Sequence, residues 1–141
     1  MSLVFWDTML FVYLIEESPG FHVRVSDIRE RMLERKDRLC TSTLTLGELL
    51  AAPYARNKPE VAASYRAALS RPHLDLISFT EETAELFGRI RSDRSIAPAD
   101  AIQLACAAQA RVDLFLTNDR RLARKSVPGI HFIADLSFDY L

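Results

Sequence analysis

Short apolar runs alternate along this chain with longer segments whose apolar residues recur every three or four positions. The runs predict buried strands at residues 3–6, 39–42, 74–79, 112–117 and 130–134. The longer segments predict helices at 8–17, from 26 or 27 to about 37, at 44–52, at 59–69, from 80 onward and at 98–110, with a short basic helix after 118 or 119. Strands that alternate with helices in this way are typical of an α/β fold, with a five-strand parallel sheet and helices on both faces.

Capping residues and prolines set the expected ends of these helices. Pro98 fits a first-turn position, where the missing N–H costs no hydrogen bond. Thr43 is expected to cap the third helix, which should end before Pro53, and Ser26 or Asp27 is expected to cap the second. In parallel sheets of this kind, ligands bind beyond the carboxyl ends of the strands. We therefore look for chemistry where strands end and helices begin.

Composition narrows the class of protein. The 141 residues are 49% hydrophobic and 26% charged, with a net charge of −1, which suits one soluble domain over residues 1–141. The best apolar stretch, residues 9–15, is far shorter than the ~18 residues of a membrane span, and Asp7 before it is unlike the basic flank of a signal peptide. Cys40 and Cys106 lack metal-binding spacing and are expected to be buried thiols. We expect a cytoplasmic protein with no membrane segment.

Arginine supplies 15 of the 18 basic residues. The guanidinium group binds phosphate through two parallel hydrogen bonds, whereas lysine acts as a point charge, although codon usage alone can also enrich arginine. One basic set is almost unopposed by acids and is the better candidate for binding a nucleic-acid backbone: Arg120, Arg121, Arg124 and Lys125.

Four acids are expected at one edge of the sheet. Asp7 follows the first strand and Asp119 follows the fourth, while Glu48 lies in the helix after the second strand. Asp100 lies in the first turn of a helix that leads into the fourth strand, so it returns to the edge where that strand ends. Each aspartate also has a purely structural explanation, because caps and first turns of helices favour this residue.

Glu48 is harder to explain as a structural residue. On a helical projection it shares a face with Leu44, Ala51 and Ala52, so we expect it to point toward apolar material. Glutamate is almost never fully buried unless it is paired or bound to a metal.

Four crowded carboxylates must be neutralised by protons or cations. At ~6 Å and an effective dielectric of about 20, each pair repels by roughly 3 kcal/mol. Oxygen-only ligands suit Mg²⁺ or Mn²⁺ rather than zinc, and His22, His73 and His131 are scattered and are read as structural. A carboxylate-held divalent cation suits phosphoryl chemistry.

The motifs that carry these acids are VFWDT at residues 4–8, STLTLGEL at 42–49, APADAI at 97–102 and LTND at 116–119. Their order and spacing resemble a PIN-domain ribonuclease, most closely a VapC-type toxin of bacterial toxin–antitoxin pairs. The resemblance covers nearly the whole chain and implies a three-layer PIN-like sandwich around a five-strand parallel sheet. It also implies that Asp7 and Asp100 hold the metal directly and that Glu48 and Asp119 act partly through water. Thr8 and Thr117 would then be hydrogen-bonding helpers.

The sequence departs from the family pattern at one position. Family members usually carry a small polar residue two positions after the first aspartate, and here that residue is Met9. This puts a hydrogen bond from that position in doubt and leaves the metal ligands in place.

The resemblance implies an Mg²⁺- or Mn²⁺-dependent endoribonuclease that cleaves single-stranded or loop RNA, with Arg120, Arg121 and Arg124 holding the RNA backbone. The alternative is a catalytically silent PIN-like module that binds RNA or a partner, which loss of an acid would signal.

The resemblance further implies an antitoxin partner and a homodimer. One apolar set is richer than one helix face can bury, so part of it is expected to be exposed for the antitoxin: Leu10, Phe11, Tyr13, Leu14 and Ile15. The alanine-rich face of the helix that begins at Pro98 would allow close packing in a dimer.

Other enzyme classes fit less well. A haloacid-dehalogenase-type phosphatase needs a second aspartate where Met9 stands, and a receiver domain gives no reason for Glu48 in an apolar helix. The four glycines form no phosphate-binding loop, and the chain has no Gly-x-Ser-x-Gly elbow for acyl transfer.

Overall fold

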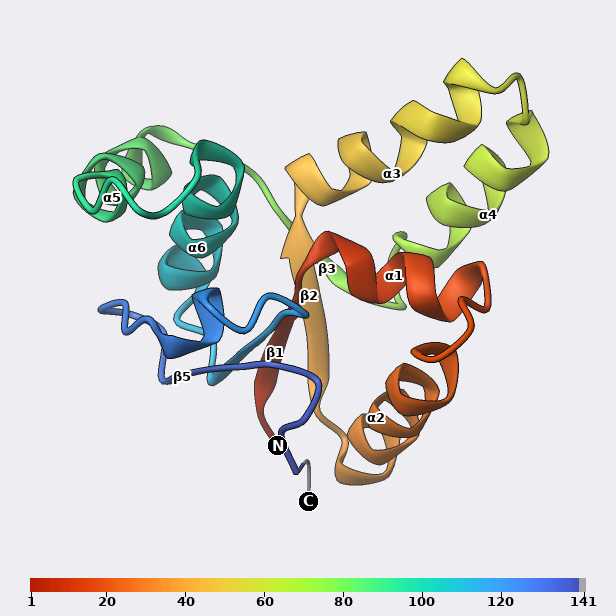
Figure 1. The fold of residues 1–141 in the computed structure, drawn as a ribbon, viewed down its shortest axis with the longest axis horizontal. Helices are drawn as coiled ribbons and strands as arrows, with labels where there is room; N and C mark the ends of the chain where they lie inside the picture. The colour runs from red at the N-terminus through yellow and green to blue at the C-terminus, as the bar shows by residue number, and fades with distance from the viewer. Residues whose placement is uncertain (140–141) are drawn as a thin grey trace.

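A computed structural model describes residues 1–139 and contains one parallel five-strand sheet (Figure 1). The strand order is β3-β2-β1-β4-β5. The strands are β1 Leu3–Trp6, β2 Arg38–Ser42, β3 Asp75–Ile77, β4 Leu114–Leu116 and β5 Phe132–Ala134. The expected parallel α/β fold is confirmed, with β3, β4 and β5 shorter than the apolar runs that predict them.

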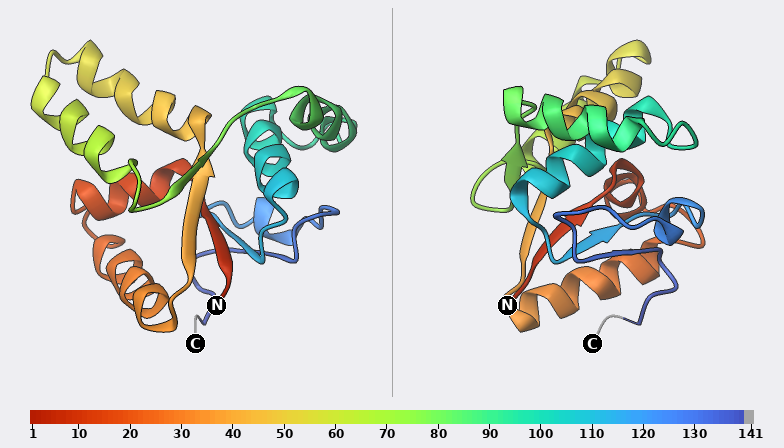
Figure 2. Two further views of the ribbon diagram at one scale, coloured as in Figure 1. Left: turned by 180° about the vertical axis from the view of Figure 1, so that it is seen from behind. Right: turned by 90° about the vertical axis from the view of Figure 1, so that its left-hand side faces the viewer.

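Helices cover both faces of the sheet. Figures 1 and 2 show α1 to α4 on one face and α5 with α6 on the other. The helices are α1 Thr8–Ile15, α2 His22–Arg35, α3 Thr43–Ala55, α4 Pro59–Ala68, α5 Glu81–Arg91 and α6 Pro98–Ala110, followed by the 3₁₀ turn η1 Leu122–Arg124. The molecule is therefore the three-layer sandwich that the resemblance implies.

The central strand β1 divides the core in two. Side chains alternate along a strand, so Val4 and Trp6 join the cluster under α1 to α4, while Phe5 joins the cluster under α5 and α6. All three are completely buried, and Phe5 stacks on Phe115 of β4 with ring centroids 4.9 Å apart. This burial on both faces explains why β1 has no polar alternation.

The boundaries of α6 agree with the prediction, whereas α2 and α3 begin earlier than expected. Asp27 does not cap α2 but lies inside it, where its carboxylate pairs with Arg24 at 3.5 Å and with Arg31 at 3.2 Å, one turn to either side. Ser42, not Thr43, caps α3 by accepting a hydrogen bond from the backbone N–H of Thr45.

The prediction that α3 ends before Pro53 is wrong. Proline removes one hydrogen bond to the preceding turn. Pro53 is nevertheless buried in the last turn of α3, in line with Thr45 and Leu49. Packing on this inner face, where α4 lies against α3, keeps the helix continuous.

The alanine-rich face of α6 is not available for a dimer contact, which corrects the expectation made for it. Ala101, Ala105, Ala107 and Ala108 are buried within the chain itself. Small side chains let α6 lie close to both the sheet and α5, so this face is used internally.

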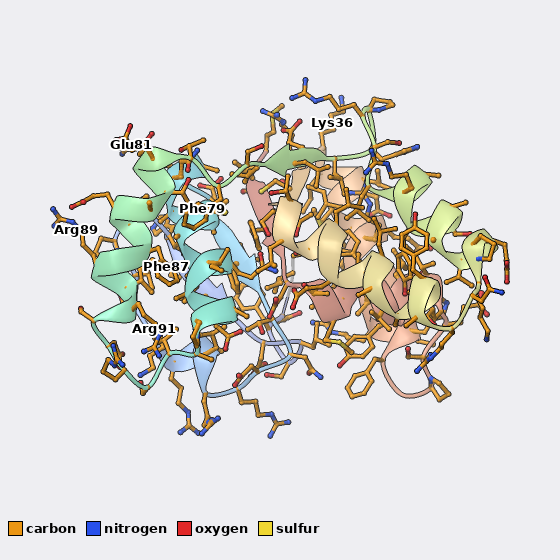
Figure 3. The ribbon with its side chains drawn as sticks, turned by 90° about the horizontal axis from the view of Figure 1, so that it is seen from above. Lys36, Phe79, Glu81, Phe87, Arg89 and Arg91 are labelled. Atoms are coloured by element: carbon orange, nitrogen blue, oxygen red, sulfur yellow. The ribbon has the colours of Figure 1, made fainter. Side chains whose placement is uncertain are left out.

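Figure 3 shows α5 beside α6, with Glu81 at its start and Arg89 and Arg91 near its end. These charges match the helix dipole, which favours acids at the first turn and bases at the last. Phe79, just before α5, meets Phe87 edge to face with centroids 6.2 Å apart. The start of α5 is thus fixed by both capping and aromatic packing.

The apolar residues of α1 are only partly available to a partner. Leu10, Phe11 and Tyr13 are buried in the core, whereas Leu14 and Ile15 are half-buried. Part of the set is therefore accessible, as expected.

Both cysteines are buried and unpaired, as predicted. Burial raises the pKa of Cys40 to about 12 and that of Cys106 to about 11. Among the described residues, no helix has the length and apolar character needed to cross a membrane.

Candidate functional site

Asp7 stands where β1 ends and α1 begins. Its backbone N–H continues the sheet by donating to the carbonyl of Leu116 at 2.9 Å. Its carboxylate accepts one hydrogen bond from the backbone N–H of Thr8 and another from the Thr117 hydroxyl, both at 2.9 Å. Asp7 is therefore a helix cap, and its side chain is also held in one orientation by a group from β4.

The local environment opposes ionisation of Asp7. Burial raises its pKa above the ordinary value of 3.8, and the hydrogen bonds from Thr117 and Thr8 offset only part of this effect. Glu48 and Asp119 raise it further by charge repulsion. A cation bound here would offset both the cost of burying the charged carboxylate and its repulsion by Glu48 and Asp119.

Asp100 comes to the same edge from the other face of the sheet. It lies in the first turn of α6, two residues after Pro98, and is half-buried. Its pKa is raised, mainly by burial and to smaller extents by charge repulsion from Asp7, Asp119 and Glu48, in decreasing order. The four acids therefore lie near enough to act on one another, as the topology of the strands predicts.

Glu48 is exposed, which corrects the expectation that it points toward apolar material. The inner face of α3 is formed by Thr45, Leu49 and Pro53, and Ala51 is exposed. Ala52, also expected on the apolar face, is exposed too, because α3 extends past the sheet, where α4 packs against it from one side (Figure 1).

Glu48 is held at the acidic edge by a hydrogen bond. The Thr8 hydroxyl donates to Glu48 Oε1 at 2.7 Å. The sequence therefore identified the position of Glu48 correctly but gave the wrong reason for its orientation.

Asp119 combines a capping role with proximity to the other acids. Its Oδ1 accepts from the backbone N–H groups of Arg121 at 2.9 Å and Leu122 at 3.2 Å, which fixes the turn into η1. Its own N–H donates to the Thr117 hydroxyl at 3.1 Å. Buried Thr117 thus contacts both Asp7 and Asp119 and sets their relative position.

Gln103 is a residue that the sequence analysis missed. It lies on α6 three positions after Asp100 and is 2% exposed. Its Nε2 donates to the hydroxyls of Thr45 at 2.7 Å and Thr8 at 3.1 Å. The available signal was an amide in the apolar, alanine-rich helix α6, three positions after Asp100 and so on the same helix face.

The donor set fits a hard divalent cation. All four groups are carboxylates, and Mg²⁺ and Mn²⁺ prefer oxygen ligands. Within residues 1–139, no three carboxylate, imidazole or thiol groups are gathered closely enough to form a metal-binding group. The acids are therefore neighbours at one edge and not a closed coordination shell.

Basic side chains lie next to the acids in the chain. The three arginines after Asp119 are all exposed: Arg120, Arg121 and Arg124. Hydrogen bonds from Ser137 lower the pKa of Asp135, and Arg120 adds a smaller effect of the same sign. The three arginines therefore place positive charge on the segment that directly follows Asp119.

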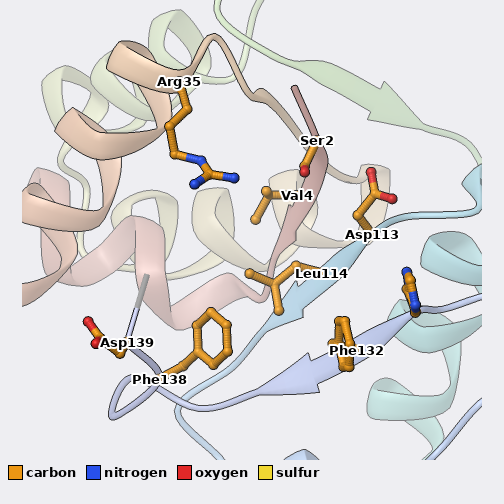
Figure 4. Close-up of a pocket in the computed structure, with 9 residues that line it drawn as sticks. Ser2, Val4, Arg35, Asp113, Leu114, Phe132, Phe138 and Asp139 are labelled. Carbon is orange, nitrogen blue, oxygen red and sulfur yellow. The ribbon is translucent and has the colours of Figure 1, made fainter. Parts of the chain in front are cut away.

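Two pockets lie apart from the acids. One of about 360 Å³ is lined by Val4, Leu114 and Phe132, near the amino ends of β1, β4 and β5, and by Phe138 after the last strand (Figure 4). This is the end of the sheet opposite to the acids. A second pocket of about 380 Å³ lies between α1, α2 and α4.

Comparisons with known proteins agree with this fold. Residues 4–128 match the model of the PIN domain family. DNA-bound VapBC from Salmonella typhimurium aligns with a TM-score of 0.72 and 26% identity, over 96% of this chain and 99% of that chain. VapBC2 from Rickettsia felis, bound to a promoter DNA fragment, aligns with a TM-score of 0.71 and 18% identity, over 94% of this chain and 98% of that chain. VapBC-5 from Mycobacterium tuberculosis, a member of the VapBC family of toxin–antitoxin systems, aligns with a TM-score of 0.64 and 18% identity, over 96% of this chain and 99% of that chain. A comparison with curated protein sequences gave no match.

Proposed function

Because this chain belongs to the PIN domain family, we propose that it is the toxin of a VapC-type toxin–antitoxin pair and acts as an Mg²⁺- or Mn²⁺-dependent endoribonuclease on single-stranded or loop RNA. The observation that carries the proposal is that four acids meet at the carboxyl edge of the sheet: Asp7, Glu48, Asp100 and Asp119. Repulsion from Glu48 and Asp119 raises the pKa of Asp7, and the other three acids together raise the pKa of Asp100. No fold gains stability from such crowding.

Asp7 and Asp100 would hold the cation directly, and Glu48 and Asp119 would complete the site partly through water. A bound divalent cation polarises a phosphoryl oxygen and makes water a stronger nucleophile. The chain's own residues set the geometry: the Thr117 hydroxyl donates to the Asp7 carboxylate and accepts from the backbone N–H of Asp119, and the backbone N–H groups of Arg121 and Leu122 hold the Asp119 carboxylate.

The exposed side chains of Arg120, Arg121 and Arg124 would bind RNA phosphates beside the acidic edge. Each guanidinium group can make two parallel hydrogen bonds to one phosphate. Binding through phosphates carries no base specificity and weakens as salt rises. Replacing these arginines should therefore weaken binding to unrelated RNA sequences by a similar factor.

An antitoxin would bind to α1, α2 and α4. The pocket of about 380 Å³ there is lined by Phe11, Leu14 and Ile15 from α1, with Ala67 and Ala68 from α4. An apolar helix face of a partner can fill such a groove. The similar VapBC structures support a partner of this kind.

The protein would also form a homodimer, through a surface other than the buried face of α6. Size determination at micromolar concentration tests this, because a species of 16.0 kDa alone contradicts it.

A metal-dependent cleavage assay tests the proposal. Parent protein, Asp7→Asn and the control Glu82→Gln are incubated with single-stranded RNA in Mg²⁺, in Mn²⁺ and in chelator. Glu82 is an exposed acid in the first turn of α5, on the helix that flanks α6. Cleavage should require metal and fall by orders of magnitude in Asp7→Asn only.

The alternative, a silent RNA-binding module, predicts binding of RNA in chelator and no cleavage in either metal. The presence of all four acids opposes it. A parent protein that binds RNA without cutting it would replace the nuclease proposal with this one.

A further inference from the structure

Behind the acidic edge, a buried amide joins segments that are far apart in the sequence. Gln103 of α6 accepts a hydrogen bond from the hydroxyl of Ser42, which caps α3. This contact places Oε1 toward Ser42 and Nε2 toward Thr45 and Thr8. Because Gln103 is 2% exposed, water cannot replace these partners without cost.

The amide determines where the Thr8 hydroxyl can donate its proton. Gln103 Nε2 donates to the hydroxyl oxygens of Thr45 at 2.7 Å and Thr8 at 3.1 Å. A hydroxyl oxygen has two acceptor lone pairs and one proton. Because Thr8 Oγ1 turns a lone pair toward the amide, its proton points away from Gln103, and it is donated to Glu48 Oε1 at 2.7 Å rather than to the more distant Thr45 Oγ1 at 3.2 Å.

We propose that Gln103 is a positioning residue, whose amide directs the Thr8 hydroxyl toward Glu48 and so keeps that carboxylate at the acidic edge. The inference depends on the proposed function, because it concerns the same site. Gln103 would touch neither the metal nor the RNA and would act through Thr8.

Charge repulsion explains why Glu48 needs such an anchor. Glu48 is exposed, and among residues 1–139 the Thr8 hydroxyl is its only hydrogen-bond partner. Asp7 and Asp100 both repel it. Without the amide, Thr8 can turn toward Thr45, and the Glu48 side chain is then free to move into solvent, away from the other acids.

Gln103→Met is the direct test, because methionine keeps the length of the side chain and removes the amide. Gln109→Met is the matched control. Gln109 lies on the same helix, and its amide accepts a hydrogen bond from the Thr83 hydroxyl, on the α5 side and apart from the acids. Both variants lose an amide hydrogen bond, buried at Gln103 and half-buried at Gln109, so both should lose stability.

Metal dependence separates the two variants. Loss of an outer partner of a metal site typically costs 10–100-fold in metal affinity or activity. We expect the Mg²⁺ concentration for half-maximal RNA cleavage and the Kd for Mn²⁺, measured by calorimetry, to rise about tenfold or more in Gln103→Met. Gln109→Met should keep the parent values.

Thr8 gives a second route if Gln103→Met fails to fold. Thr8→Val should raise the Kd for Mn²⁺ as Gln103→Met does, and Thr8→Ser, which keeps the hydroxyl, should restore the parent value. In a double variant the two effects on the Kd should not add, because both substitutions break the same hydrogen-bonded connection from Gln103 through Thr8 to Glu48.

The outcomes distinguish the inference from the proposed function. If the parent cleaves RNA and Gln103→Met or Thr8→Val keeps the parent Kd for Mn²⁺, the positioning role is wrong and the nuclease proposal stands. A parent that binds Mn²⁺ without cleaving RNA refutes the nuclease, and the Kd values still test the role of Gln103. A parent that binds no Mn²⁺ overturns both.

Discussion

Replacement of Asp100 by asparagine should make the metal-free protein more stable at neutral pH. Asparagine has nearly the size of aspartate and removes its charge. Burial is the main reason that the pKa of Asp100 is raised, followed by repulsion from Asp7, Asp119 and Glu48. A group whose charged form is disfavoured in the folded state stabilises that state when the charge is removed.

The size of the effect follows from two opposing contributions. Two unit charges ~10 Å apart, at an effective dielectric of about 20, interact by roughly 1.7 kcal/mol. Because Asp100 is only half-buried, solvent and ions screen its three neighbours, and we take on the order of 2 kcal/mol for their sum. The dipole of α6 favours an acid in its first turn by about 0.3–1 kcal/mol. The net gain from these charge interactions is roughly 1 kcal/mol, or about 2–4 °C in Tm, and relief of the cost of burying a charge adds to it in the same direction.

Thermal melting in chelator at pH 7 measures this gain. Glu82→Gln is the control, because Glu82 also lies in the first turn of a helix but is exposed and outside the acidic edge. Its loss should lower the Tm slightly, so the two variants should shift in opposite directions. Added Mn²⁺ should raise the Tm of the parent more than that of Asp100→Asn. An Asp100→Asn protein that melts below the parent in chelator would refute the repulsion argument.

Four further predictions concern the acidic edge, two glycines and one cysteine. Raised pKa values at Asp7 and Asp100 mean that their stabilising contribution is full below pH 3.8 and is lost as pH rises through the raised values, so the Tm in chelator should fall with pH over this window and fall less in Asp100→Asn. In urea titrations, Gly88→Ala should stabilise by about 0.5–1 kcal/mol, since Gly88 is exposed inside α5 with open space around it. Gly129→Ala should destabilise by about 1–3 kcal/mol, since φ is +97° and the new Cβ would lie 3.0 Å from a carbonyl oxygen of α6. Cys40, with its pKa raised to about 12 by burial, should react with iodoacetamide only on unfolding, as mass spectrometry can follow.

Local signals predicted part of the fold well. Helix α6 has the expected bounds because Pro98 fits only its first turn and its apolar residues continue to Ala110. The helix predicted from residue 80 onward begins at Glu81, because Thr80 caps it. These ends depend on neighbouring residues, so the sequence alone contains the information.

Features that depend on distant segments were not predictable from local patterns. The apolar face assigned to Glu48 assumed that alanines face the core, yet Ala51 is exposed because α3 extends past the sheet. Gln103 was missed because its partners, Ser42, Thr45 and Thr8, are 58 to 95 positions away in the chain. A buried amide has no sequence pattern of its own until the tertiary contacts are known.

The central place of β1 has a consequence for synthesis of the protein. Strand β1 is synthesised long before β4, with which it pairs, and the Asp7 carboxylate accepts a hydrogen bond from the Thr117 hydroxyl, 110 positions later. At ~5–20 residues per second, translation of that interval takes roughly 5–20 s. During this time Asp100 and Asp119 have not joined Asp7, and half of the acidic edge is missing. A nascent chain that has not yet been extended past Asp119 therefore cannot carry the complete set of four acids.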